Sequence, residues 1–295
     1  MKPRRGIKKT GNTGQHAPVL PVSVSSDHPI ITLLSDFGTS DHFVGSVKGV
    51  IVSVNPHVSL IDITHDIPAH DIEAGAFTLL ASYKTFPQHT IHLAIVDPGV
   101  GSTRRPLLVI AGDQFFVGPD NGIFSFIYEA EPNHQVYELT NDVYFRHPVS
   151  ATFHGRDIFA PAAAALSTGV APLELGSPIV DAVRLTSINM KVLAQGGFKG
   201  RILHIDRFGN CITNIRRELL TVEQEHRTKI TIRGKTIRSF RPFFSSTDKD
   251  EGKLFAIWGS AGFLEIAAYE QSAAKKLKAR SGDNVVLKLV KRLPA

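Results

Sequence analysis

The sequence predicts an α/β N-terminal domain with a largely parallel sheet, followed by a small all-β C-terminal domain that resembles a barrel. In the first part of the chain, short apolar runs rich in β-branched residues alternate with segments of helical periodicity. From about residue 187 onward, short strand-like runs follow one another and are separated by Gly, Asp and Ser. The first pattern is typical of strand–helix–strand units, and the second is typical of a barrel.

The elements of the first domain are expected in a regular order. Residues 30–34 form a short apolar strand, and a helix follows over 43–54, where apolar residues recur at spacings of three and four. Residues 58–63 form the next strand, and Asp71 can cap the second helix. Residues 91–96 form the third strand. The remaining elements are strands over 106–110 and 114–117, a turn over 119–122 and a helix over 160–166.

The second domain is expected to consist of short strands joined by turns. These strands lie at 200–205, 211–215, 229–232, 254–258, 263–267 and 284–290. The predicted boundaries are a disordered basic tail at 1–29, the α/β domain at 30–190 and the β-barrel domain at 198–295, with Gly196 and Gly197 in the linker.

The formal net charge of +6 comes mainly from the start of the chain. The first 29 residues carry five Lys and Arg and one Asp, which leaves the rest of the chain close to neutral. A short basic tail is typically solvated and disordered. Neither zinc-finger spacing nor an RNA-binding aromatic motif accompanies it. We therefore expect no nucleic-acid partner.

Cysteine usage and hydropathy indicate the compartment. Cys211 is the only cysteine, which excludes an intramolecular disulfide and favours a reducing compartment. No apolar run approaches the roughly 20 residues that span a bilayer, and the start of the chain lacks the apolar segment of a signal peptide. We therefore expect a cytoplasmic protein with no membrane partner.

Two aspartates directly follow predicted strands. Asp36 comes after the first strand and Asp97 after the third. In open α/β sheets, ligands bind outside the carboxyl ends of the strands, so both carboxylates are expected at one crevice. The alternative for Asp36 is that it only caps a turn or a helix.

Arg104 and His154 complete a candidate catalytic group with Asp97. Residues 97–101 (Asp-Pro-Gly-Val-Gly) predict a tight turn, and Arg104 and Arg105 follow within its reach. His154 lies just before a helix, a place suited to a base or an anion site. Because an arginine stabilises hydroxide and a carboxylate orients an imidazole, the group indicates an enzyme that moves protons or hydroxide. The alternatives are a structural Asp–Arg pair in a surface loop and a structural histidine.

Several motifs for other chemistries are incomplete. Residues 62–71 are rich in metal ligands, but Pro68 breaks the helix that would align the two histidines. The tripeptide at 36–38 (Asp-Phe-Gly) lacks the other motifs of protein kinases, and no phosphate-binding glycine loop is present. We therefore expect neither a metal nor a cofactor.

The second domain contributes a polar cluster over 204–210. There, Phe208 lies between Asp206 and Asn210. An exposed aromatic ring can stack on a base while a neighbouring amide contacts the edge of that base. The alternative is a β-turn between two strands. Residues 259–265 predict a second turn that could contact a ligand.

Six motifs in order resemble the S-adenosyl-L-methionine (SAM) hydroxide adenosyltransferases, or SAM hydrolases, which are related to the fluorinase and chlorinase enzymes. The motifs are SDFGTSD, VDPGVGSTRR, PDNG, TFHGRDIF, IDRFGN and GSAGFLEIA. The resemblance extends from about residue 30 to the C-terminus. It implies hydrolysis of SAM to adenosine and L-methionine by in-line attack of water or hydroxide on C5′. It also implies a homotrimer with active sites between neighbouring subunits, and SAM as substrate rather than cofactor.

The same resemblance implies roles for individual residues. Asp97, Arg104 and His154 correspond to the catalytic triad that handles the water. The substrate-binding positions are Asp36 at the ribose hydroxyls, Asp41 near the methionine portion, Asn210 at the adenine with Asp206 and Phe208 beside it, and Ser260 and Glu265 in the remaining ligand loop. Tyr269 stands where relatives often carry Asn, so this contact differs from the family pattern.

A SAM-dependent halide adenosyltransferase is the nearest alternative. That branch replaces the Asp of the triad with an aromatic residue, replaces the His-Gly pair and inserts a loop after the arginine segment. Here Asp97, His154 and Gly155 are present, and Arg105 leads directly into a predicted strand. Two further alternatives are a non-catalytic protein that binds adenosine or SAM, and an enzyme that acts on another adenosyl or nucleoside substrate.

Overall fold

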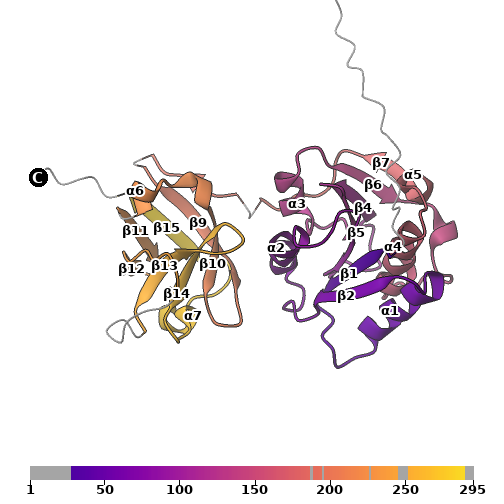
Figure 1. Cartoon of the computed structure of the whole chain (residues 1–295), viewed down its shortest axis with the longest axis horizontal. Helices are drawn as coiled ribbons and strands as arrows, with labels where there is room; N and C mark the ends of the chain where they lie inside the picture. The colour runs from indigo at the N-terminus through magenta and orange to yellow at the C-terminus, as the bar shows by residue number, and fades with distance from the viewer. Residues whose placement is uncertain (1–27, 187–188, 195, 226, 245–251, 290–295) are drawn as a thin grey trace, which may run out of the picture.

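The fold is built on two separate β-sheets, one in each half of the chain (Figure 1). The computed structural model describes residues 28–186, 189–194, 196–225, 227–244 and 252–289. The predicted disordered tail lies outside the described residues up to residue 27. The prediction of an α/β domain followed by a barrel-like β domain is confirmed.

The N-terminal sheet has seven strands in the order β2-β1-β3-β5-β4-β6-β7. Its parallel strands are β1 (Ile30–Ser35), β2 (Ser59–Thr64), β3 (Ile91–Ile95) and β5 (Gln114–Pro119). Antiparallel pairing adds β4 (Pro106–Ala111), β6 (Gln135–Leu139) and β7 (Gly176–Ile179). The parallel half was predicted, whereas β6 and β7 were not.

Helices cover both faces of this sheet (Figure 1). Leu33 and Leu93 pack with helices α1 (Phe43–Val54) and α4 (Ala160–Ser167). Their neighbours Leu34 and Ala94 point to the other face and pack with α2 (Ile72–Tyr83) and α3 (Ser125–Ala130). Because successive side chains in a strand point to opposite faces, a strand covered on both sides must be apolar throughout. This is why the predicted apolar runs form central strands.

The predicted start of α2 is confirmed in its details. The Asp71 side chain accepts a hydrogen bond from the backbone N–H of Ala74 at 2.9 Å. An aspartate at this position satisfies one of the free N–H groups of the first turn and interacts favourably with the helix dipole.

The C-terminal sheet is antiparallel and nearly closed. Its strand order is β12-β11-β15-β9-β10-β14-β13, and β8 pairs with β9. The strands are β8 (Lys191–Val192), β9 (Phe198–Ile205), β10 (Cys211–Arg216), β11 (Thr228–Ile232), β12 (Lys235–Ile237), β13 (Leu254–Trp258), β14 (Phe263–Ala268) and β15 (Asn284–Leu289). Just after β12, Ser239 and Arg241 exchange backbone hydrogen bonds of 2.8 and 2.9 Å with Ala256 of β13. These bonds join the two ends of the strand path.

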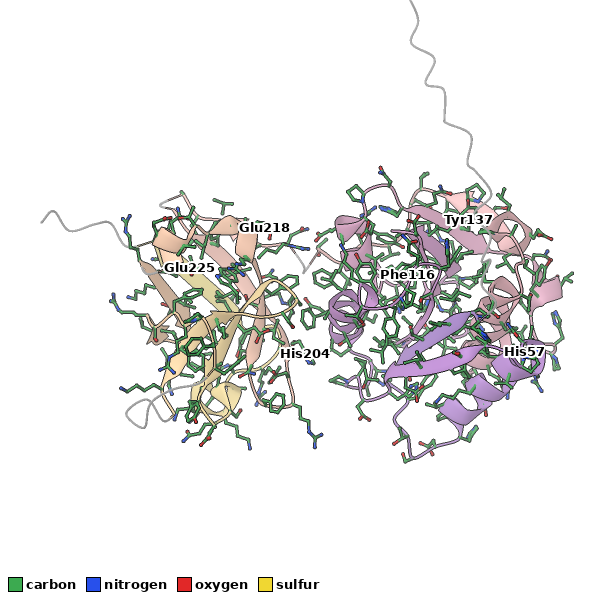
Figure 2. All side chains as sticks on the ribbon, in the orientation of Figure 1. His57, Phe116, Tyr137, His204, Glu218 and Glu225 are labelled. Carbon is green, nitrogen blue, oxygen red and sulfur yellow. The ribbon has the colours of Figure 1, made fainter. Side chains whose placement is uncertain are left out.

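Contacts from the N-terminal helices hold the two halves together. The His204 ring of β9 stacks on Phe77 of α2 with the ring centroids 5.7 Å apart, and it lies on the side of the barrel that faces the first domain (Figure 2). Arg216 of β10 forms an ion pair of 2.7 Å with Glu129 of α3. Gly196 and Gly197, which were predicted to lie in the linker, lie between the paired strands β8 and β9 of the C-terminal sheet. Both have positive φ, a conformation that glycine adopts without strain.

Candidate active site

Asp36 and Asp97 lie at the same edge of the N-terminal sheet, as predicted. Strands β1 and β3 are parallel neighbours, and Ser35 pairs with Ile95 at their carboxyl ends. Asp36 follows Ser35 directly, and Asp97 comes two residues after Ile95. The Asp36 carboxylate accepts a hydrogen bond from the backbone N–H of His70 at 2.9 Å.

The turn after Asp97 brings the segment of His154 close to it. Gly101 has a φ of +78°, and a side chain at this position would collide with the carbonyl oxygen of Ala151. Only glycine combines this backbone conformation with such a close approach. The Asp-Pro-Gly-Val-Gly turn therefore packs directly against the residues that precede His154.

Arg104 joins the other two residues of the predicted triad. Its Nε donates to both carboxylate oxygens of Asp97 at 3.0 Å, and its Nη2 donates to Oδ2 at 2.5 Å. The same Nη2 lies 2.7 Å from Nδ1 of His154. The side chains of Arg104 and Asp97 are only 9% and 6% exposed. The Arg104–Asp97 ion pair is therefore well shielded from water. Removing one partner of such a buried pair typically destabilises a protein by about 3–5 kcal/mol, so the two side chains are held in place.

The hydrogen bond from Arg104 fixes the protonation of His154. Because a guanidinium in a protein is always a donor, Nδ1 of His154 must be the acceptor, and the neutral ring then carries its proton on Nε2. Burial and the nearby charge of Arg104 both lower the pKa of His154 from its usual value, against the opposing effect of Asp97. The ring is therefore neutral at neutral pH.

Asp157 anchors the backbone that presents His154. It is fully buried, and it accepts hydrogen bonds from Nε of Arg156 at 2.7 Å and from the backbone N–H of Ser150 at 2.9 Å. Although burial acts in the opposite direction, these hydrogen bonds hold the pKa of Asp157 below its usual value. His154 itself begins a single wide helical turn, Gly155–Phe159, that leads into α4.

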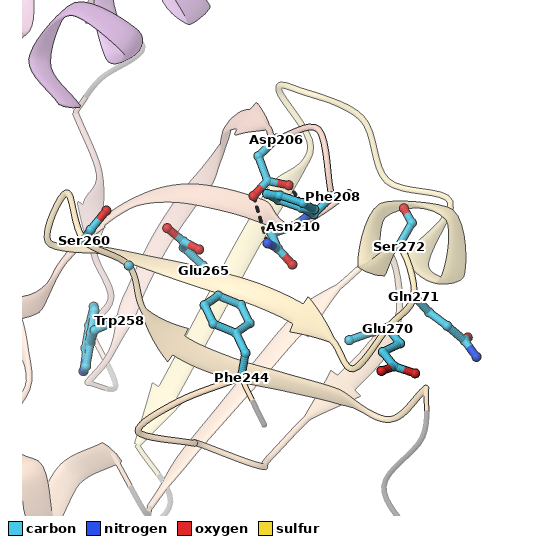
Figure 3. A pocket seen from close by; sticks show the side chains of 12 residues that line it. Asp206, Phe208, Asn210, Phe244, Trp258, Ser260, Glu265, Glu270, Gln271 and Ser272 are labelled. Carbon is cyan, nitrogen blue, oxygen red and sulfur yellow. Dashed lines mark hydrogen bonds between the residues drawn. The ribbon is translucent and has the colours of Figure 1, made fainter. Parts of the chain in front are cut away.

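The five substrate-binding residues predicted in the second domain line one cavity of about 710 Å³ (Figure 3). These residues are Asp206, Phe208, Asn210, Ser260 and Glu265. The cavity belongs entirely to the barrel. Asp41, by contrast, is exposed in the loop before α1.

Inside the cavity, Asp206 holds Asn210 in place. Its two carboxylate oxygens accept hydrogen bonds of 2.8 Å from the backbone N–H and from Nδ2 of Asn210 (Figure 3). Phe208 projects from the turn between these residues and is 77% exposed. Burial and the neighbouring charge of Asp206 raise the pKa of Glu265 to about 7. The cavity thus combines an exposed ring, an oriented amide and a carboxyl group that titrates near neutral pH.

Sequence reasoning missed part of this lining. Phe244, Trp258, Glu270, Gln271 and Ser272 also line the cavity. Phe244 is 47% exposed and lies opposite Glu265 in Figure 3. The adjacent pair Phe243-Phe244, in a polar segment, was a signal for an exposed aromatic site. Trp258 carried no such signal, because it ends an apolar strand.

The residues considered as metal ligands serve other purposes. In the described part of the chain, no group of three or more His, Cys, Asp and Glu side chains could hold a metal ion. Within 62–71, Asp62 forms an ion pair of 2.7 Å with Lys48, and Asp71 caps α2. A search of the described helices finds none long and apolar enough to cross a membrane.

Comparison with known proteins identifies relatives over most of the chain. The chain is 33% identical to the (R)-S-adenosyl-L-methionine hydrolase of Methanocaldococcus jannaschii, over 84% of its own length and 91% of that protein. It is 35% identical to the enzyme of the same name from Thermus thermophilus, over 85% of this chain and 96% of that protein. A fluorinase from Nocardia brasiliensis is more distant, at 27% identity over 88% of this chain and 97% of that protein.

The fold and the two domains match known proteins as well. A crystal structure of an uncharacterized conserved protein from Thermotoga maritima superimposes with a TM-score of 0.80 and 32% sequence identity, covering 87% of this chain and 99% of that one. Residues 31–176 match the SAM hydroxide adenosyltransferase N-terminal domain, and residues 200–286 match the C-terminal domain of the same family. The chain therefore belongs to the SAM hydroxide adenosyltransferase family.

Proposed function

We propose that this protein hydrolyses SAM to adenosine and L-methionine. The observation that carries the proposal is the largely buried triad in which Arg104 binds both Asp97 and His154. The relatives named as SAM hydrolases point to the same reaction. Each member of the group supplies one requirement for delivering an oxygen nucleophile: a fixed positive charge, a carboxylate that orients it and a neutral imidazole.

The reaction is a displacement at C5′ of the adenosyl group. The oxygen of water attacks C5′, the C5′–S bond breaks, and the sulfonium sulfur leaves as the neutral thioether of methionine. One proton of the water is lost to the site or to solvent. The main task is to hold the water opposite the sulfur, in line with the bond that breaks. Excluding bulk water strengthens the effect of Arg104 on the developing hydroxide.

Arg104 and His154 have different roles toward the attacking water, as donor and as proton acceptor. Nη1 of Arg104 is buried and has no hydrogen-bond partner among the described residues, so it is the donor left for the oxygen nucleophile. Nδ1 of His154 accepts from Arg104 in this structure. For His154 to take the proton of the water, the water must replace Arg104 as the partner of Nδ1. Asp97 keeps Arg104 in place while this exchange occurs. General-base help of this kind is typically worth about 10²–10⁴-fold.

The remaining residues are proposed to hold the substrate. Asp36 binds the ribose hydroxyls with the carboxylate oxygen that His70 does not occupy. Asn210 contacts the adenine and Phe208 stacks on it, while Asp206 orients Asn210. Asp41, Ser260 and Glu265 are proposed to lie near the methionine portion or in the ligand loop. A carboxylate is suited to this place, because SAM carries a sulfonium and an ammonium.

We further propose a homotrimer in which each active site lies between neighbouring subunits. The opposite net charges of the two domains support this arrangement, although they nearly cancel in the total. Residues 30–190 carry 7 Lys and Arg against 16 Asp and Glu, whereas residues 198–295 carry 20 against 10. A head-to-tail ring brings the acidic domain of one copy to the basic domain of the next, whereas a two-fold interface pairs like patches. The triad and the barrel cavity come from these two different domains.

The proposal includes no metal and no cofactor, since the triad itself supplies the charge, the orientation and the proton acceptor. We expect the protein to be cytoplasmic, in keeping with its single cysteine. The halide alternative has less support, because fluorinase is the more distant relative and Asp97, His154 and Gly155 are all present here.

Product analysis tests the proposed reaction. Purified protein is incubated with SAM, with and without excess chloride, and the products are separated by chromatography. We expect adenosine and L-methionine in equal amounts, unchanged by chloride. A 5′-chloro nucleoside would instead identify a halide adenosyltransferase. Bound adenosine or SAM without turnover would identify a binding protein.

The pH dependence of kcat/KM should show two steps on its acid side. His154 must be neutral to accept a proton, and its lowered pKa places this step below pH 6.5. Glu265 has a pKa of about 7, so its negative charge, which attracts the cationic substrate, forms as the pH rises through that value. We therefore expect kcat/KM to rise with pH through both steps, because it reports groups of the free enzyme.

A single substitution separates these two steps. Glu265→Gln should remove the step near pH 7 and leave the one below pH 6.5. A variant that keeps the upper step would show that Glu265 does not act on the substrate.

A further inference from the structure

A line of three polar side chains runs beneath the loop that carries Asp36. Oγ of Ser35 lies 2.7 Å from Nδ1 of His65, and Nε2 of His65 lies 3.1 Å from Oδ1 of Asp62. Lys48 of α1 binds the other oxygen of Asp62 at 2.7 Å. Ser35 and His65 are only 2% and 6% exposed. None of these residues belongs to the catalytic triad or to the proposed substrate-binding residues.

The line has the residue types of a serine-hydrolase triad, but its surroundings exclude that chemistry. Ser35 ends β1 and borders a small cavity of about 10 Å³, lined mainly by apolar side chains such as Leu33, Val47 and Ile95. This volume holds about one water molecule. A nucleophilic serine must reach its substrate, and Ser35 has no space for one.

The direction of the hydrogen bonds can be assigned from the charges. Nε2 of His65 faces the Asp62 carboxylate, so the proton of the neutral ring belongs there. Nε2 of His65 has no hydrogen-bond partner among the described residues, so its contact with Asp62 acts chiefly through charge. Nδ1 of His65 is therefore the acceptor, and the hydroxyl of Ser35 is the donor. This leaves the Ser35 oxygen free to accept from the backbone N–H of Phe37 at 3.3 Å.

These bonds hold the backbone on both sides of Asp36. Ser35 precedes Asp36, and Phe37 follows it. The next N–H, that of Gly38, donates to the carbonyl oxygen of His65 at 2.8 Å. Five residues after His65, the N–H of His70 donates to the Asp36 carboxylate itself. The segment 35–38 is therefore joined to the segment 65–70 by several hydrogen bonds, and His65 makes two of them.

We propose that Ser35, His65 and Asp62 form a positioning network that directs the Asp36 carboxylate toward the substrate. The inference rests on the proposed function, in which Asp36 binds the ribose. Ser35 and His65 are positioning residues in this account, because they act through Asp36 and do not touch the substrate. Losing the network turns or loosens Asp36 but leaves the triad at Asp97 intact. The effect should therefore fall on substrate binding rather than on turnover.

The chain offers a matched control on the same strand. Oγ1 of Thr32 lies 2.7 Å from Nδ1 of His92, and both residues are fully buried. This is the same hydroxyl–imidazole bond, but it lies three residues farther from Asp36, and in the described part of the chain neither side chain has a hydrogen bond to segment 35–38. Ser35→Ala and Thr32→Val each delete one such bond. Ser35→Thr keeps the hydroxyl, and the small neighbouring cavity can accept its methyl group.

The experiment compares the three variants by KM, kcat, melting temperature and affinity for adenosine measured by calorimetry. We expect Ser35→Ala to raise KM and to weaken adenosine binding about tenfold, the scale of one lost hydrogen bond, with kcat within about twofold of wild type. Thr32→Val should lower the melting temperature by about as much as Ser35→Ala does, but it should not raise KM. Ser35→Thr should restore KM. In an Asp36→Asn background, Ser35→Ala should add little, because both act on one contact.

Equal KM and adenosine affinity for Ser35→Ala and Thr32→Val would overturn the inference. So would full additivity of Ser35→Ala with Asp36→Asn. A failure of the proposed function can be distinguished from this result, because the wild type itself would then show no SAM hydrolysis. The calorimetric measurement of adenosine binding tests the network in that case as well.

Discussion

Replacing Arg104 with methionine is expected to lower kcat for SAM hydrolysis by about 10²–10³-fold, the usual loss when one charge-stabilising donor is removed. Arg104 binds Asp97 through two nitrogens and His154 through one. The substitution therefore removes the positive charge and the link between the other two residues at once. Steady-state kinetics on folded protein, verified by a melting curve, measure the effect. Arg104→Lys keeps the charge but loses the planar fork, and it should recover only part of the activity.

Arg105 provides the control for this result. It is the next residue in the chain and is also paired with carboxylates, Asp120 at 2.6 Å and Asp181 at 2.7 Å. Among the described residues, its side chain forms hydrogen bonds and ion pairs with Asp120 and Asp181 and none with the triad. Arg105→Met should lower stability and leave kcat within about threefold of wild type. Comparable kcat losses in Arg104→Met and Arg105→Met would show that the loss at Arg104 is not specific to the triad.

Two inactive variants should restore activity when they share one trimer. Arg104→Met disables the half-site of the first domain, and Asn210→Leu disables the half-site of the barrel. If each site joins the first domain of one subunit to the barrel of the next, a mixed ring contains a site with both halves intact. Random mixing of equal amounts gives about a quarter of the wild-type sites. We expect the co-expressed variants to reach about that fraction of wild-type kcat/KM.

Each variant expressed alone serves as the control and should remain inactive. Light scattering of the wild type would give the mass of three chains. Co-expressed variants that stay as inactive as the single ones would show that every site is built within one chain.

The sequence predicted the parts of the fold that depend on local pattern. The apolar runs that became β1, β3 and β5 are buried on both faces, and such runs leave few alternatives. The proximity of Asp36 and Asp97 followed from parallel pairing, because the carboxyl ends of neighbouring parallel strands meet at one edge. Strand β6 was missed because Gln135–Leu139 is short and mixes polar with apolar residues.

Side-chain environments could not be predicted in the same way. The pKa of Glu265 depends on its burial beside Asp206, 59 residues earlier in the chain. The role of Asp206 as the partner of Asn210 depends on the shape of one turn. The line from Ser35 to His65 and Asp62 connects two strands and a loop, and its histidine stood in a segment considered only for metal binding. The opposite charges of the two domains were hidden because they nearly cancel in the total.

The most direct test of the central claim is to run the incubation with SAM in water enriched in heavy oxygen and to weigh the products by mass spectrometry. If the Asp97–Arg104–His154 group directs water to C5′, the label enters the 5′-hydroxyl of adenosine and is absent from methionine, and Arg104→Met slows its incorporation by about 10²–10³-fold. Label in methionine, or adenosine formed without label, would contradict the account.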